Sequence, residues 1–98
     1  MMLQINATLI KILPSEQKGE NTYQKVWVET TKDMYPQKLE LDLTPKLVRV
    51  LTEKNVSEGG FYTFHLNLKG REMVKAEGNK IFNIIQAWDI VPCVTEEN

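Results

Sequence analysis

The chain has 98 residues, with 42% hydrophobic and 26% charged residues and a net charge of −1. This length favours one domain with one modest core, and the composition lies in the ordinary globular range. The balanced charge excludes a protein that attracts nucleic acid through its overall field. Binding of that kind would need a local cluster of Lys and Arg.

The sequence also bears on location and redox state. The single cysteine, Cys93, excludes an internal disulfide and fits a reducing compartment. The N-terminal residues lack the basic start and apolar run of a signal peptide. No apolar segment approaches the roughly 20 residues that cross a bilayer. We therefore expect a cytoplasmic protein without a membrane partner.

The first expected strand begins at Leu3, where apolar and polar side chains alternate as far as Leu9. The phase then slips, because Ile10 and Ile12 are apolar while Lys11 is polar. A bulge at this point would swap the faces and bend the strand, so that it could pair with two neighbours of a small barrel. The alternative is a strand buried on both faces.

Residues 23–30 and 37–43 predict two strands, because their side chains alternate with period two. In the first of them, Val26 and Val28 are the natural core face, which directs Trp27 outward. In the second, the leucines share one face and the charged residues share the other. An outward Trp beside Lys side chains is the most informative feature of the sequence.

Connections between these strands carry turn residues. Residues 14–22 are polar and contain Gly and Pro, which predicts a loop that joins the first two strands as a hairpin. Residues 31–36 predict a turn formed by Asp33 and Pro36.

A helix is predicted over residues 45–54. Thr44 can cap its free amides, and Pro45 suits the first helical position. An apolar stripe at i, i+1 and i+4 then begins at Leu47.

The last third of the chain predicts two further strands, over residues 61–68 and 81–91. The charged residues 69–80 between them are expected as a long hairpin loop with extended arms. Aromatic residues of these strands that we expect in the core are Tyr62, Phe64 and Trp88.

This order of elements is strand, strand, strand, helix, strand, strand. It predicts an all-β fold, a five-stranded OB-fold Greek-key barrel with one helix between strands three and four. An SH3-like barrel would not place a helix of several turns there. The domain is expected over residues 1–93, followed by a short acidic tail at 94–98.

Enzyme chemistry has little support. His65 and Cys93 lie far apart in the sequence and are its only residues of their kinds, so a nucleophile–base pair is not expected. Metal ligands of the usual types are too few for a transition-metal site. We therefore predict no enzyme activity and no cofactor.

Nucleic-acid binding has better support. OB-folds bind oligonucleotides on strands two and three, between the first and last hairpin loops, with basic residues for phosphates and aromatic rings for bases. The candidate residues are Lys25, Trp27, Lys38, Phe61, His65, Lys69, Arg71, Lys75, Lys80 and Phe82.

Each part of this hypothesis has an alternative. Trp27 could lie in a subunit interface, and the basic hairpin could be a solvated loop. Glu40 and Asp42 oppose the hypothesis, because they put negative charge on the same outer face as Lys38. An OB barrel that serves only as a protein–protein interaction subunit is the competing function.

Several short motifs also resemble one known family. They are Val26-Trp27-Val28-Glu29-Thr30, Tyr35-Pro36-Gln37-Lys38, Gly70-Arg71-Glu72 and Ala87-Trp88-Asp89-Ile90. The chain resembles, over residues 3–91, a family of short bacterial and phage proteins. That family is catalogued as a domain of unknown function and is similar to OB-fold single-stranded DNA-binding proteins.

The resemblance implies an OB-fold and single-stranded DNA binding. It also implies replication or recombination proteins as partners. Bacterial relatives usually carry a long tail with an acidic-hydrophobic tip, and here only Glu96-Glu97-Asn98 remains, without that tip. Fewer aromatics on the strand face imply modest affinity per subunit. We expect a homo-oligomer, a dimer or tetramer, because pairing would lengthen the site.

Overall fold

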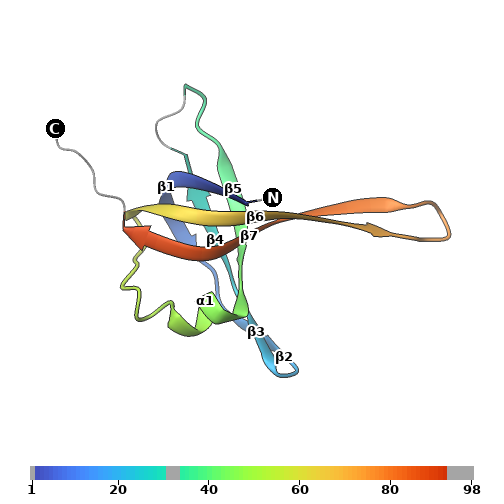
Figure 1. Ribbon diagram of the computed structural model, residues 1–98, viewed down its shortest axis with the longest axis horizontal. Helices are drawn as coiled ribbons and strands as arrows, with labels where there is room; N and C mark the ends of the chain where they lie inside the picture. Colours follow the sequence, from blue (N-terminus) through green and yellow to red (C-terminus); the bar gives the residue numbers. More distant parts are fainter. Residues whose placement is uncertain (1, 31–33, 93–98) are drawn as a thin grey trace.

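The computed structural model describes residues 2–30 and 34–92. Strands and one helix follow one another along the chain (Figure 1). They are β1 (Met2–Ile12), β2 (Glu16–Lys18), β3 (Asn21–Tyr23), β4 (Lys25–Glu29), β5 (Lys38–Leu43), α1 (Pro45–Val50), β6 (Phe61–Met73) and β7 (Lys80–Pro92).

Five of these strands close into a barrel in the order β1-β4-β5-β7-β6. All neighbours run antiparallel except β5 and β7, which are parallel. The helix lies between β5 and β6 in the chain and below the barrel in Figure 1. This is the predicted OB-fold, and the prediction is confirmed.

A bulge bends β1, as the slip in its sequence pattern predicted. Leu9 pairs with Val28 of β4 and Lys11 pairs with Trp27, so Ile10 is the extra residue. On the other side of the bend β1 pairs with β6, where Ile5 lies opposite Phe64. One strand therefore borders two neighbours and helps to close the barrel.

Alternation along each strand sends one set of apolar side chains into the barrel. Val26 and Val28 are 1% and 0% exposed, whereas Trp27 between them is 41% exposed. Leu41 and Leu43 of β5 are also buried, and Leu39 is half-buried. The predicted faces of β4 and β5 are confirmed.

The helix begins where its cap predicts but is shorter than expected. The Leu47 amide donates to Thr44 Oγ1 at 3.1 Å, and Pro45 is the first helical residue. The helix ends at Val50 rather than at residue 54, and turns continue to Asn55, whose φ of 60° cannot extend a right-handed helix. No helix in the described ranges is long and apolar enough to cross a membrane.

Both long connections contain more strand than predicted. The predicted loop at residues 14–22 is largely occupied by the small β2–β3 hairpin, which pairs Glu16 with Tyr23 and turns at Gly19 with a φ of 64°. Within residues 69–80, β6 continues to Met73 and β7 begins at Lys80, so only six residues form the turn. The expected hairpin with extended arms is present, but its loop is shorter than predicted because the two arms pair residue by residue.

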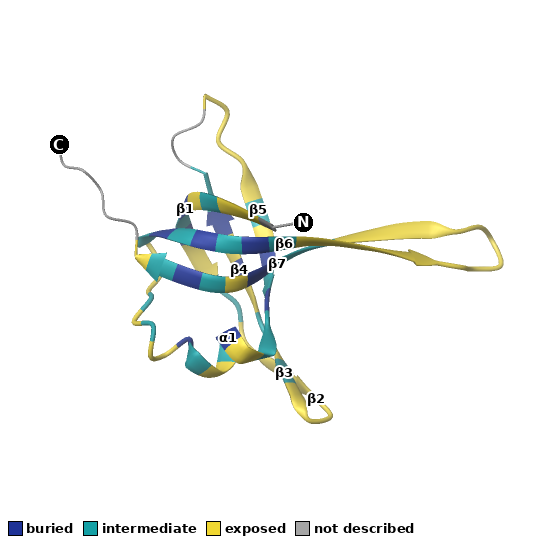
Figure 2. Cartoon of the chain, viewed as in Figure 1, coloured by how far each residue is buried: buried dark blue, intermediate teal, exposed yellow. Residues whose placement is uncertain are grey.

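The paired arms form a ribbon, residues 68–85, that projects from the barrel (Figure 1). Every residue from 68 to 83 is exposed (Figure 2). The radius of gyration is 15.0 Å, against roughly 13 Å for a compact domain of this size. The ribbon accounts for that excess.

Trp88 does not lie in the core, so that prediction was wrong; Tyr62 and Phe64 are buried as expected. Its side chain is 40% exposed because a second bulge interrupts the β6–β7 pairing. His65 pairs with Asp89 and Leu66 pairs with Ala87, which leaves Trp88 as the extra residue on β7. The bulge turns Ala87 and Ile90 inward and Trp88 outward.

Candidate nucleic-acid interface

The structure separates the ten predicted binding residues into three groups. The outer face of β4 and β5 carries Lys25, Trp27 and Lys38. The ribbon carries Lys69, Arg71, Lys75, Lys80 and Phe82. The outer face of β6 carries Phe61 and His65. Only some of these residues adjoin one another.

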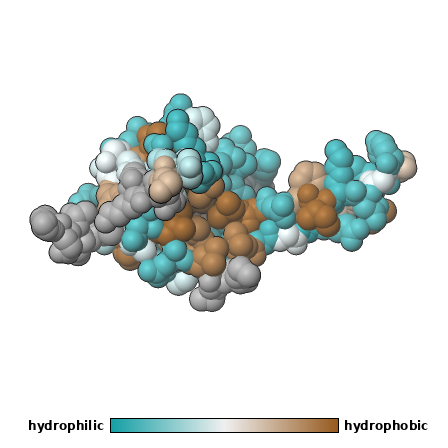
Figure 3. Space-filling view, turned by 90° about the horizontal axis from the view of Figure 1, so that it is seen from above, coloured by the Kyte–Doolittle hydropathy of each residue, from teal (hydrophilic) through white to brown (hydrophobic). Residues whose placement is uncertain are grey.

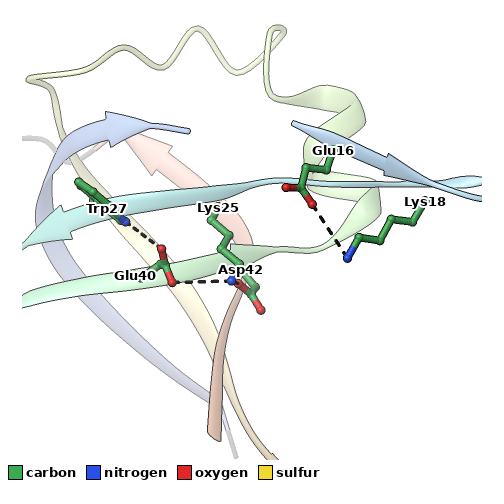
Figure 4. A network of polar contacts seen from close by, with 6 residues as sticks. All are labelled: Glu16, Lys18, Lys25, Trp27, Glu40 and Asp42. Atoms are coloured by element: carbon green, nitrogen blue, oxygen red, sulfur yellow. Dashed lines mark hydrogen bonds and ion pairs between the residues drawn. The ribbon is translucent and has the colours of Figure 1, made fainter. Parts of the chain in front are cut away.

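Trp27 occupies the centre of the β4–β5 outer face, in one cross-strand row with Lys11 and Glu40. Its indole Nε1–H donates to Glu40 Oε2 at 2.9 Å (Figure 4). Lys11 Nζ lies 5.4 Å from the centroid of the indole ring, a cation–π contact. The ring is therefore held in place before any ligand arrives.

Lys25 lies on the same face and is surrounded by negative charge. Its Nζ is 3.7 Å from both Glu40 Oε1 and Asp42 Oδ1 (Figure 4). Lys38 lies opposite Glu29 in the next row. Cations and carboxylates are therefore balanced on this face, which does not by itself attract a polyanion.

Next to this face is a cleft of about 780 Å³ between the β2–β3 hairpin and the base of the ribbon. Four cations line it: Lys18, Lys25, Lys69 and Arg71. Its two lining carboxylates are Glu16 and Asp42, and its other lining residues include Tyr23, Ile84 and Gln86. The lining thus combines a surplus of positive charge with an aromatic and an aliphatic side chain.

The cations on the two walls of the cleft differ in whether a carboxylate lies near them. Lys18 pairs with Glu16 at 4.0 Å, but both side chains are more than 70% exposed, so the pair is weak. Lys69 and Arg71 on the ribbon form no ion pair with any residue in the described part of the chain. The ribbon wall is therefore the place where the cleft offers uncompensated positive charge.

The ribbon face that borders the cleft continues outward with a regular pattern. Directly opposite residues on it pair a cation with an apolar side chain: Lys69 with Ile84, Arg71 with Phe82, and Lys80 with Met73. Figure 3 shows hydrophobic residues between hydrophilic ones along the ribbon. These pairs share one face because they are two residues apart along each strand.

Lys75 and Lys80 lie toward the tip of the ribbon, and Phe82 lies opposite Arg71. None of the three lines the cleft. Lys75 Nζ is 6.0 Å from the Phe82 ring centroid, at the limit of a cation–π contact. Only Lys25, Lys69 and Arg71 of the predicted residues are brought together at the cleft.

Phe61 and His65 lie on a different side of the barrel. The His65 ring centroid is 5.1 Å from that of Trp88, with the planes tilted by 41°. Next to them, Lys54 Nζ and Asp89 Oδ1 form a 2.6 Å ion pair. The hydrogen bond from Lys54 is the main reason that the pKa of Asp89 lies below its ordinary value, and burial opposes this shift.

Sequence reasoning missed Lys18, Tyr23, Ile84 and Gln86 as cleft residues. Lys18 falls within the predicted loop, and Tyr23 is the first residue of a predicted strand. The available signal for the β2–β3 hairpin was a turn dipeptide, Gly19-Glu20, with a short run of three residues on each side of it, 16–18 and 21–23. Ile84 and Gln86 carried no such signal, because their position depends on the pairing of β7 with two strands.

Catalytic and metal-binding features are sparse in the described part of the chain. No group of three His, Cys, Asp or Glu side chains in it could hold a metal ion. Cys93 and the acidic tail at 94–98 lie outside the described residues, as does Asp33 of the predicted turn.

Two solved structures with a similar fold are described as single-stranded DNA-binding proteins. The mitochondrial protein Rim1 from S. cerevisiae aligns with a TM-score of 0.67 at 14% identity, over 92% of this chain and 91% of its own. The small single-stranded DNA-binding protein from Streptomyces coelicolor aligns with a TM-score of 0.68 at 12% identity, over 96% and 94%. Because the sequence identities are this low, these alignments establish a shared fold and no more.

Comparisons of sequence give a family but no activity. No curated protein matches the chain. A family model described as a domain of unknown function, DUF3127, matches residues 4–91.

Proposed function

The chain belongs to the DUF3127 family, and we propose that it binds single-stranded DNA with little sequence preference. The observation that carries this proposal is the cleft, in which the uncompensated Lys69 and Arg71 face a wall containing Tyr23. Sites for single-stranded nucleic acid combine these two kinds of group, cations along the backbone and rings under the bases.

Similar structures support the proposal. Each of the solved structures reported above is described as a single-stranded DNA-binding protein, and each shares the barrel over more than nine-tenths of this chain. We extend the proposal to a role in replication, recombination or repair, with a cytoplasmic location and no enzyme activity.

The arrangement suggests how a strand would lie. Its phosphates contact Lys69 and Arg71, while its bases turn toward Tyr23 and the floor of the cleft. The strand then continues over the β4–β5 face, where Trp27 stacks on a base. Lys25, whose charge Glu40 and Asp42 already neutralise, donates to base edges rather than to phosphates. The outer ribbon residues Lys75, Lys80 and Phe82, together with Lys38, Phe61 and His65, extend the path of longer strands.

A salt titration tests the proposal. A labelled oligo-dT should bind at low ionic strength and lose affinity as salt rises, with a log–log slope of about −0.7 for each neutralised phosphate. Absence of binding at low salt would contradict the proposal.

A second candidate is an OB-fold protein–protein interaction subunit that does not bind nucleic acid. It is favoured by Trp88, which is 40% exposed beside His65 on the side of the barrel away from Trp27. Exposed tryptophans are enriched at protein interfaces. Loss of a protein partner in a Trp88→Ala variant, together with no binding of oligo-dT by the wild-type protein at low salt, would support this function.

We also propose self-association into a dimer or tetramer. Leu3, Leu68 and Trp88 are each about two-fifths exposed, and apolar side chains of this size gain by being covered. Light scattering that gives the monomer mass at tens of micromolar would contradict self-association and leave the DNA-binding proposal standing.

A further inference from the structure

The floor of the cleft is a row of three polar side chains on neighbouring strands. Lys25 of β4 lies opposite Asp42 of β5, and Asp42 lies opposite Gln86 of β7. All three line the cleft. The row offers an ammonium donor, a carboxylate acceptor, and an amide that can do both.

Asp42 is the residue of this row that can only accept hydrogen bonds from a ligand. Its side chain is 33% exposed, and its Oδ1 lies 3.7 Å from Lys25 Nζ. Its other oxygen accepts no hydrogen bond from the residues that the structure describes. An ionised carboxylate only accepts, so a ligand group at this oxygen must be a donor.

Charge decides which part of a strand meets the floor. Lys69 and Arg71 on the ribbon wall are uncompensated, whereas the single positive charge of Lys25 is shared by two carboxylates. Phosphates are therefore attracted to the ribbon wall and repelled from Asp42. A nucleotide held this way points its base toward the floor.

We propose, on the premise that the chain binds single-stranded DNA, that Asp42 makes the floor selective. It favours bases with an exocyclic amino group over thymine. Cytosine offers its N4 amino group and adenine its N6 amino group, and carboxylates accept from such groups. Thymine presents the O4 oxygen there, which a carboxylate repels. Its one ring donor, N3–H, lies between two carbonyl oxygens, so a carboxylate that approaches it also meets their negative charge. The Gln86 amide can rotate to donate or accept a hydrogen bond at the neighbouring atom of any base, so it adds no preference of its own.

The preference is small because it acts at one base position and near solvent. One hydrogen bond gained or lost there corresponds to about a 3- to 10-fold change in affinity. This factor is compatible with binding that needs no defined sequence. It predicts that oligo-dC binds more tightly than oligo-dT of the same length.

Fluorescence anisotropy with labelled oligo-dC and oligo-dT tests the proposal. The wild-type protein should prefer oligo-dC by about 3- to 10-fold. Asp42→Asn should bring the ratio close to one, because an amide can also donate to thymine O4. Glu29→Gln is the matched control. It removes one negative charge from the same outer face, opposite Lys38 and outside the cleft, and should leave the ratio unchanged.

The outcomes separate this inference from its premise. Equal affinity for the two oligonucleotides, or a ratio that Asp42→Asn does not change while its melting temperature stays normal, would overturn the role of Asp42 and leave DNA binding intact. Failure of both oligonucleotides to bind at low salt would overturn DNA binding itself. A ratio that falls equally in Glu29→Gln would show an effect of overall charge and overturn selection by Asp42.

Discussion

The ring of His65 lies 5.1 Å from that of Trp88, and both rings are on the outer surface of the barrel. Trp88 is 40% exposed and Trp27 is 41% exposed, on different sides of the molecule. The fluorescence of both tryptophans is therefore sensitive to solvent and ligands, and neither residue gives a constant signal from a buried site.

This arrangement makes a fluorescence prediction. In a Trp88→Phe variant the emission comes from Trp27 alone, and we expect it to be quenched when oligo-dT is added, because a base stacks on the indole. In a Trp27→Phe variant, emission from Trp88 should change little with an oligo-dT too short to extend from the cleft to His65, which lies beside Trp88. Quenching confined to Trp88 would place the DNA on the β6–β7 side of the barrel.

Trp27→Ala should weaken DNA binding and leave the fold intact. A base stacked on an aromatic ring contributes about 1–3 kcal/mol, which is roughly 5- to 150-fold in affinity. The neighbours of Trp27 on β4 are buried while its own side chain is not, so the core keeps its packing. Titration and thermal unfolding measure the two effects. Dissociation of an oligomer with unchanged DNA affinity would instead place Trp27 in a subunit interface.

Arg71→Ala should weaken binding and also flatten its salt dependence. Arg71 is uncompensated at the cleft, so its loss removes one phosphate contact and about 0.7 from the magnitude of the log–log slope. The matched control is Arg49→Ala, because Arg49 is exposed on α1 and does not line the cleft. An identical slope in wild type and Arg71→Ala would exclude a phosphate contact at this residue.

Lys54 and Asp89 should make stability depend on pH. The folded state lowers the pKa of Asp89 below 3.8, chiefly through the hydrogen bond from Lys54, so the folded protein binds fewer protons than the unfolded chain. The resulting stability is present above about pH 4 and is lost as pH falls through the folded pKa. Lys54→Met should lower the free energy of unfolding at pH 7 by about 1 kcal/mol.

Chemical denaturation across the acid range measures this effect. The curves of wild type and Lys54→Met should converge as pH falls, because protonation removes the ion pair from the wild type. Lys46→Met is the control, since Lys46 is exposed on α1 and forms no ion pair within the described residues. A difference between wild type and Lys54→Met that stays constant down to low pH would contradict a role for Asp89.

Local patterns in the sequence determined a large part of this protein. Period-two alternation predicted which side chains of β4 enter the core and that Trp27 does not, because a strand has only two faces. The slip after Leu9 predicted the bulge in β1. Thr44 and Pro45 predicted where the helix starts. The Thr44 side chain accepts a hydrogen bond from a free amide of the first turn, and Pro45 lacks an amide hydrogen at a position where the helix needs none. These features depend on neighbours within a few residues.

Tertiary structure alone decided which side chains meet in the cleft. The cleft joins Tyr23, Lys25, Asp42 and Arg71, and only the closure of the barrel brings these distant segments together. Pairing of β4 with β5 sets the charge balance of Lys25, and the bulge in β7 turns Trp88 outward. Register between strands is a long-range property, set by how the whole core packs, so no local pattern reports which side chains will meet.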